Sequence, residues 1–329
     1  MNKKYIYCIT ILFLLGLATQ LFAGGSLGQS GANFLQIAAE PRGAALGGAI
    51  TAIVDGADAL YWNPAGALNT HKFAISFAHT NWFLDTRLTY GGAVWKVNDN
   101  NAIGFSVSSF SMDEMEITTV YDPTGTGEYY NAGDLSAGIS YARRIMSQFS
   151  FGITAKYIQE YIWDESANQL GIDLGSIYNI NFMNLRLGMA VRNFGGTLKH
   201  SGNDIDARLA EEMAREEQDN PRLERLTPEF RLPQVFQMGV AVDVMQTEMG
   251  VLTLMADVDV PSDNNERLIF AGEYAFQNMI FARASYGANY DVSSFAIGLG
   301  VKLKGIEIDY SFSDHGVFNS VHRFGIKIQ

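Results

Sequence analysis

The sequence predicts an all-β fold, a transmembrane antiparallel β-barrel of about fourteen strands with an N-terminal plug inside its lumen. Apolar and polar residues alternate through most of residues 71–329, in segments of about ten residues separated by turn residues, which is typical of outer-membrane barrels. The connections between these segments alternate between short and long, and a segment rich in glycine and alanine precedes the first of them. After the first 23 residues, no stretch approaches the run of about 20 apolar residues that a membrane helix requires.

Residues 1–23 have the features of an export signal peptide. Lys3 and Lys4 provide the charged start, residues 5–17 form the apolar run, and a short segment ending at Ala23 resembles a cleavage site. Cleavage would remove Cys8, the single cysteine, so stability would not come from disulfides. It would also leave 21 basic and 35 acidic residues, a net charge of −14, which argues against nucleic acid as a partner.

Residues 24–70 are predicted to form the plug, because they hold 9 glycines and 11 alanines and show no strand alternation. Small residues allow backbones to approach closely. Asp58 is placed to cap one short helical turn, which Asn63-Pro64 should end because the residue before a proline disfavours helix. The segment could instead be a core helix of a soluble α+β domain, but the strands that follow favour the plug. The residues expected to form the plug motif are Gly47, Gly48, Asp55, Asp58, Trp62, Asn63, Pro64, Ala65 and Gly66.

Residues 71–329 are predicted to form the barrel. The expected strands are 72–79, 86–97, 101–112, 134–144, 149–161, 169–179, 185–194, 235–244, 251–260, 267–276, 279–289, 294–303, 306–312 and 321–328. The links after even-numbered strands are short, such as 277–278 and 304–305, whereas every long link follows an odd-numbered strand. Outer-membrane barrels pair short periplasmic turns with longer outer loops. Residues 113–133 and 195–233 are therefore expected to be long outer loops.

Charged residues are expected to face the lumen, in the strand phase opposite to the apolar residues. The inward basic residues are Arg87, Lys156, Arg186, Arg192, Arg283, Lys302, Arg323 and Lys327, and the inward acids are Glu160, Asp173, Asp243, Asp257, Asp259, Glu273, Glu307 and Asp309. This balance of signs differs from the single-sign ring of an ion-selective filter. The charges either pair and hold the plug or are solvated groups in a wet lumen. A fourteen-stranded barrel leaves space that side chains alone do not fill, which favours an occupant.

A family resemblance rests on the run from Gly43 to Ala49, the segment Asp55–Asp58 and the following ALYWNPAG of residues 59–66. These residues resemble the N-terminal signature of the PorV/PorQ family and are similar to the wider FadL-like group of fourteen-stranded outer-membrane proteins. The PorV/PorQ resemblance implies an outer-membrane location and a binding or shuttle role in type IX secretion, with secreted cargo and the translocon as partners besides outer-membrane lipids. The FadL-like resemblance implies the alternative, transport of long-chain fatty acids or other hydrophobic small molecules through a side opening.

Three features bear on the choice between secretion and transport. The acidic segment 204–224 could bind a secreted protein or could be a solvated helical excursion. The 113–133 loop carries Tyr121, Tyr129 and Tyr130, which suit either a binding surface or an interfacial aromatic belt. Gly91-Gly92 could mark an opening in the wall or a place where the plug presses close.

Catalysis and cofactor binding are not expected. Asp314-His315 and Asp85 lie in or near outer loops, but no serine or second carboxylate pattern supports a catalytic set. The remaining histidines lack metal-ligand spacing, and the glycine-rich runs lack the lysine of a phosphate-binding loop. The sequence therefore predicts a non-enzymatic protein without a metal or cofactor.

Overall fold

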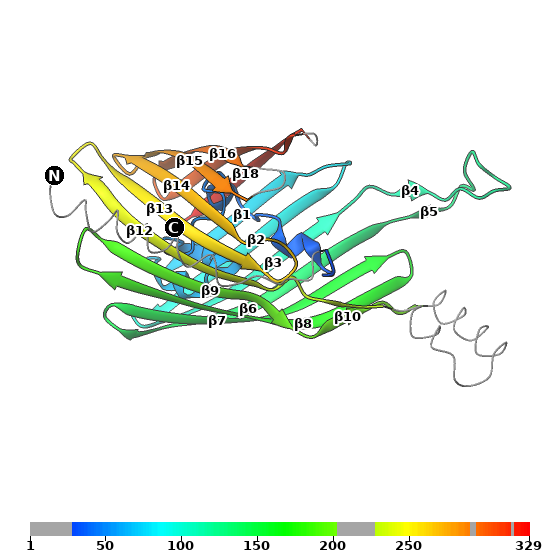
Figure 1. The fold of residues 1–329 in the computed structure, drawn as a ribbon, viewed down its shortest axis with the longest axis horizontal. Helices are drawn as coiled ribbons and strands as arrows, with labels where there is room; N and C mark the ends of the chain where they lie inside the picture. Colours follow the sequence, from blue (N-terminus) through cyan, green and yellow to red (C-terminus); the bar gives the residue numbers. More distant parts are fainter. Residues whose placement is uncertain (1–27, 203–227, 290–293, 317–318) are drawn as a thin grey trace.

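The computed structural model describes residues 28–202, 228–289, 294–316 and 319–329. Fourteen antiparallel strands form a closed barrel in which β1 pairs with β18, for example at Phe77 and Ile326 (Figure 1). The barrel strands are β1 (Phe73–Asn81), β2 (Arg87–Asn98), β3 (Asn101–Ser111), β6 (Ala132–Met146), β7 (Phe149–Ile162), β8 (Glu165–Ile180), β9 (Leu185–Gly195), β12 (Val235–Gln246), β13 (Gly250–Pro261), β14 (Arg267–Phe276), β15 (Ile280–Ala288), β16 (Phe295–Leu303), β17 (Ile306–Asp314) and β18 (Ser320–Ile328). The predicted fold class and strand number are confirmed.

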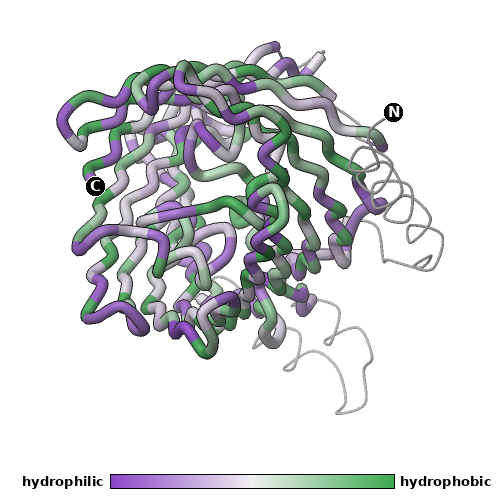
Figure 2. The backbone as a smooth tube through the Cα atoms, turned by 90° about the vertical axis from the view of Figure 1, so that its left-hand side faces the viewer, coloured by the Kyte–Doolittle hydropathy of each residue, from purple (hydrophilic) through white to green (hydrophobic). Residues whose placement is uncertain are grey.

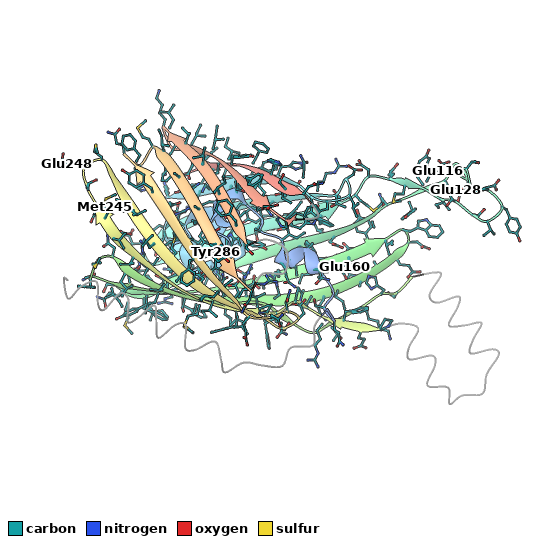
Figure 3. All side chains as sticks on the ribbon, turned by 45° about the horizontal axis from the view of Figure 1, so that its top comes forward. Glu116, Glu128, Glu160, Met245, Glu248 and Tyr286 are labelled. Carbon is teal, nitrogen blue, oxygen red and sulfur yellow. The ribbon has the colours of Figure 1, made fainter. Side chains whose placement is uncertain are left out.

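The two ends of the barrel differ in their connections. One end, here the short-turn end, has links such as residues 99–100 and 304–305, and the other, here the long-loop end, carries two small hairpins. These are β4 (Met115–Glu116) with β5 (Tyr129–Tyr130), and β10 (Thr197–Lys199) with β11 (Glu229–Arg231). Figure 3 shows Glu116 and Glu128 on a hairpin that projects far beyond the barrel, whereas Glu248 lies at the opposite end. By the usual asymmetry of outer-membrane barrels, the long-loop end is expected to face outward.

The outer wall is apolar, as alternation predicts. Phe105, Ile139 and Leu299 are 53%, 69% and 60% exposed although they lie in the middle of strands. Such side chains are stable in contact with lipid, where every strand hydrogen bond is satisfied within the closed sheet. Among the described residues, no helix combines the length and apolar character needed to cross a membrane.

Residues 28–70, here the luminal segment, run inside the strand ring. Figure 2, which looks into the barrel from its short-turn end, shows a chain segment crossing the space that the strands enclose. Its short elements are the 3-10 helices η2 (Asn33–Gln36), η3 (Gly56–Asp58) and η4 (Pro64–Leu68), and the α-helices α2 (Pro41–Ala45) and α3 (Ala59–Trp62). Its buried core residues Leu46, Ile50 and Trp62 share one cluster with Val94 of β2 and Ala241 of β12. The segment therefore packs against strands on several sides of the barrel.

The phase predicted for Arg87 is wrong. Arg87 shares the outer face of β2 with Trp95, its side chain is 44% exposed, and it pairs with Asp113 at the long-loop end. The inward face of β2 is apolar instead, since Leu88, Tyr90 and Val94 are buried and the latter two lie against the luminal segment. Apolar residues can face a lumen wherever protein, and not water, fills it.

Two local predictions also need correction. The turn Ala59–Trp62 forms and ends at Asn63, but the Asp58 side chain makes no capping hydrogen bond and contacts Lys327 instead. The connection between β7 and β8 is only residues 163–164, because the strand pairing continues through the polar residues Glu165 and Ser166. The expected export signal, residues 1–23, and the acidic segment 204–224 lie outside the described residues.

Candidate functional site

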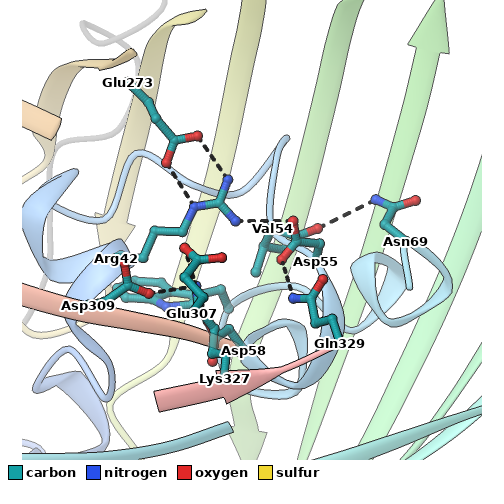
Figure 4. Close-up of polar contacts among 12 residues, drawn as sticks. Arg42, Val54, Asp55, Asp58, Asn69, Glu273, Glu307, Asp309, Lys327 and Gln329 are labelled. Atoms are coloured by element: carbon teal, nitrogen blue, oxygen red, sulfur yellow. Dashed lines mark hydrogen bonds and ion pairs between the residues drawn. The ribbon is translucent and has the colours of Figure 1, made fainter. Parts of the chain in front are cut away.

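A buried ionic cluster joins the luminal segment to the barrel wall (Figure 4). Arg42 at the start of α2 donates to both carboxylate oxygens of Glu273 on β14, at 3.0 and 3.1 Å, and to Asp55 at 3.1 Å. Two parallel N–H···O bonds hold a guanidinium in one orientation. Asp55 also accepts a hydrogen bond from the Gln329 side chain at 3.3 Å. Arg42 therefore connects two parts of the luminal segment to one strand of the wall.

Arg283 on β15 lies at the centre of the wall side of this cluster. It pairs with Glu273 at 2.6 Å, with Glu307 of β17 at 3.0 Å and with Asp309, and its side chain is 1% exposed. Lys327 of β18 extends the network to Asp309 at 2.9 Å. Buried charges are tolerable only when partners compensate their lost hydration, and this network supplies them.

Lys327 also reaches the luminal segment. Its ammonium lies 3.4 Å from Asp58, which is 1% exposed. Burial raises the pKa of Asp58, and the Lys327 ammonium opposes that shift. The Asp58 carboxylate is thus held by a lysine of the barrel wall, which explains why it does not cap the turn that follows it.

Glu40 is a second buried carboxylate of the luminal segment, and it was not among the residues predicted from the sequence. Its carboxylate accepts hydrogen bonds from the backbone N–H of Arg42 and Gly43, both at 2.6 Å, and from the Trp62 indole at 3.0 Å. Burial, with the Asp58 carboxylate, raises the pKa of Glu40 to about 7. The sequence did contain a signal, because a carboxylate directly before Pro41 is placed to cap a helix.

The Asn63-Pro64-Ala65-Gly66 part of the motif holds another part of the luminal segment in place, through contacts within the segment and with β8. The Asn63 amide donates to the carbonyls of Thr51, at 2.8 Å, and of Ser176 on β8, at 3.1 Å, while its oxygen accepts from the Ala65 N–H. A Cβ at Gly66 would lie 2.5 Å from the Val54 carbonyl oxygen, so only glycine fits there. Gly47 and Gly48 adopt φ values of +64° and +94°, which favour glycine.

The other predicted luminal charges, apart from Arg87, lie on the inner side of the wall. Lys156 pairs with Asp173 at 2.8 Å and Arg186 pairs with Asp243. Asp257 accepts from the Thr51 N–H at 3.2 Å. Of the remaining acids, Glu160 accepts from the Ala32 N–H at 2.7 Å. Several of these charges therefore contact the luminal segment directly, and others pair within the wall.

A cavity of about 340 Å³ lies between the luminal segment and the wall at the long-loop end. Its lining includes Trp62 and Ile37 from the luminal segment, and Trp82 and His315 from the loops. The imidazole of His315 packs edge-on to Trp82 and against Phe83, and burial lowers its pKa.

The residues considered for catalysis and for a wall opening have other contacts. No described contact joins His315 to Asp85, and the Asp314 carboxylate accepts from the Gly316 N–H. Within the described ranges, no three His, Cys, Asp or Glu side chains are grouped so that they could hold a metal. A Cβ at Gly92 would lie 3.2 Å from the Ala57 carbonyl oxygen, whereas one at Gly91 would meet nothing within 4 Å. Gly92 thus lies where the luminal segment presses close.

Comparisons with known proteins agree with this architecture. The family model of the type IX secretion system protein PorV matches residues 27–204. Among solved structures, the Ralstonia pickettii toluene transporter TbuX is 12% identical with a TM-score of 0.55, covering 88% of this chain and 96% of that one. A Pseudomonas aeruginosa FadL homologue is 11% identical with a TM-score of 0.51, covering 92% and 99%. No curated protein sequence matches the chain. At such low identity, the structural matches establish the fold alone.

Proposed function

The chain belongs to the family of the type IX secretion system protein PorV, and we propose from this premise that it binds secreted proteins or translocon components at the outer face of the outer membrane. The observation that carries this role is the filled lumen. The luminal segment packs against the wall and is tied to it by the Arg42, Asp58 and Asn63 contacts. We propose that this segment is a plug, so that partners are engaged at the long-loop end and are not passed through the barrel.

The β4–β5 hairpin offers a contact surface for such a partner. Val120 and Tyr121 at its tip are 90% and 91% exposed, and Tyr129 is 57% exposed. Exposed aromatic residues on a projecting element suit an interface, because they bury a large area when a partner covers them. The acidic segment 204–224 is a second candidate contact by composition.

Replacing both Val120 and Tyr121 by serine should lower recovery of secretion partners at least about tenfold, because the change removes the apolar anchors of the tip. The measurement is quantitative mass spectrometry of proteins captured with the barrel from outer membranes. Met249→Ser is the matched control, since Met249 is 63% exposed at the short-turn end. If both variants recover equal amounts of secretion partners, at equal amounts of folded barrel, the hairpin does not bind these partners.

A second candidate function is uptake of hydrophobic small molecules. The cavity at the long-loop end favours it, and one structural relative is a toluene transporter. The closed strand ring and the filled lumen count against it. Specific uptake of a fatty acid or toluene by liposomes containing the barrel, with no secretion partner recovered from membranes, would favour the transporter. We also propose that the protein has no catalytic activity, since the His315 ring packs against Trp82 and Phe83.

A further inference from the structure

Two buried arginines line the cavity at the long-loop end without a direct ion pair to any described residue. Arg192 and Arg323 are 5% and 3% exposed. In the part of the chain that the structure describes, neither guanidinium forms an ion pair, and the Nε of each lacks a hydrogen-bond partner. Asp259 lies near Arg192 and Glu40 near Arg323, but neither carboxylate forms an ion pair with these groups. An anion bound beside the two guanidinium groups would supply the direct partner that each lacks and would compensate for their lost hydration.

Aromatic rings fix the position of both guanidinium groups. The Arg192 Cζ lies 5.2 Å from the Tyr61 ring centroid and 5.0 Å from that of Trp62. The Arg323 Cζ lies 5.6 Å from the Trp82 ring, and Nη1 donates to the Ser313 hydroxyl at 2.8 Å. Cation–π contacts hold each guanidinium in place, and the Nε–H of each still lacks a hydrogen-bond partner within the described ranges, so an oxygen ligand can accept from it. The two cations are therefore held in place before any ligand arrives.

The charge of the cavity contrasts with that of the whole chain. The described lining residues include three arginines, the two above and Arg267, against one carboxylate, Asp259, which lies near Arg192 and Arg267. His315, whose pKa is lowered by burial, also faces the cavity. The chain as a whole carries a net charge of −12. A locally positive, partly enclosed site in an acidic protein selects for anions.

The rest of the lining combines apolar residues with the polar side chains of Gln36, Asn264, Ser285, Ser294 and Ser313. Ile37 and Trp62 of the luminal segment face Val235 and Ile269 of the wall. The volume of about 340 Å³ is at the lower end of the range for small-molecule sites. Apolar walls with a few fixed polar groups bind a ligand that has both an apolar body and a charged head.

We propose that this cavity is a binding site for a small organic anion, with its carboxylate or phosphate between Arg192 and Arg323 and its apolar body against Trp62 and Ile269. The ligand enters from the long-loop end, because Trp82 and His315 line the cavity from the loops there. The luminal segment closes the site below, so the ligand is bound and not conducted. This inference is independent of the secretion role.

Isothermal titration of the full-length barrel in nanodiscs of zwitterionic lipid tests the site. The probes are 4-phenylbutyrate, its neutral counterpart 4-phenyl-1-butanol, octanoate and octyl phosphate. We expect 4-phenylbutyrate to bind at least about tenfold more tightly than the alcohol, since ionic hydrogen bonds are the stronger ones. The octanoate and octyl phosphate titrations show which head group is preferred.

Three variants locate the binding. R192Q combined with R323Q should raise the Kd of 4-phenylbutyrate at least about tenfold, and Ala296→Phe, which fills the cavity while keeping both arginines, should abolish binding of both phenyl probes. Arg87→Gln, an exposed arginine on the outer face, should leave the Kd unchanged. Equal affinity for the anion and the alcohol, unchanged binding in the folded double variant, or no binding of any anionic probe would overturn the proposal. If the double variant does not fold, the proposal is tested by two other results: the preference of the wild type for the anion over the alcohol, and the loss of binding in Ala296→Phe.

Discussion

Arg283→Met should lower the free energy of unfolding by about 3–5 kcal/mol, the loss typical when one partner of a buried ion pair is removed. Arg283 pairs with Glu273, Glu307 and Asp309, and its side chain is 1% exposed. Methionine fills a similar space but leaves these carboxylates without their common cation. Lys327 and Arg42 compensate only part of that charge.

The measurement is urea unfolding of the barrel refolded in detergent, followed by the heat-modifiable migration of the folded form. Arg87→Met is the matched control, because the Arg87–Asp113 pair is largely exposed and such pairs contribute at most about 1 kcal/mol. Equal losses in the two variants would show that the buried cluster does not stabilise the barrel through Arg283.

Gly152→Val should open the lumen. A Cβ at Gly152 of β7 would overlap the Pro64 carbonyl carbon and come within 2.5 Å of the Ala65 nitrogen, so the backbone of η4 has to move. Strand pairing should survive, because valine is favourable in strands. A fourteen-stranded barrel whose occupant is displaced has space that side chains do not fill. We therefore expect a severalfold rise in the ion conductance of planar bilayers that contain the variant.

Gly91→Val provides the control for this experiment. Gly91 also lies within a barrel strand, but a Cβ there would meet nothing within 4 Å. The control should leave the conductance at the wild-type level. If Gly152→Val is folded and equally non-conducting, the luminal segment does not close the pore at η4, and its role as a plug has to be revised.

The ionic cluster also bears on how the luminal segment is oriented. Arg42 and Glu273 are 231 residues apart in the sequence, yet they are joined by two hydrogen bonds. A buried pair is not in itself strong support for stability, since well-packed apolar residues can stabilise as well. Its directional bonds do exclude other orientations of the segment. We infer that the cluster selects one arrangement of the luminal segment within the barrel.

The strand pattern was readable from the sequence because each strand of a barrel meets two different environments. Residues such as Ile139 face lipid and their neighbours face the lumen, so a period of two marks each strand. The prediction went wrong for Arg87 because the inward face of β2 packs against protein and is itself apolar. The composition of a strand does not distinguish lipid from a dry protein interior.

By itself, the sequence determined the barrel class, the fourteen strands and the presence of a small-sided segment before them, since these depend on local periodicity and composition. Only the tertiary structure decided which charges meet. Closure of the barrel brings Arg42 to Glu273 and Asp58 to Lys327, and it leaves Arg192 and Arg323 together beside a cavity. These relations depend on strand register and on the path of the luminal segment in three dimensions. Electrostatic partners are chosen by distance in space, which a linear pattern of residues does not record.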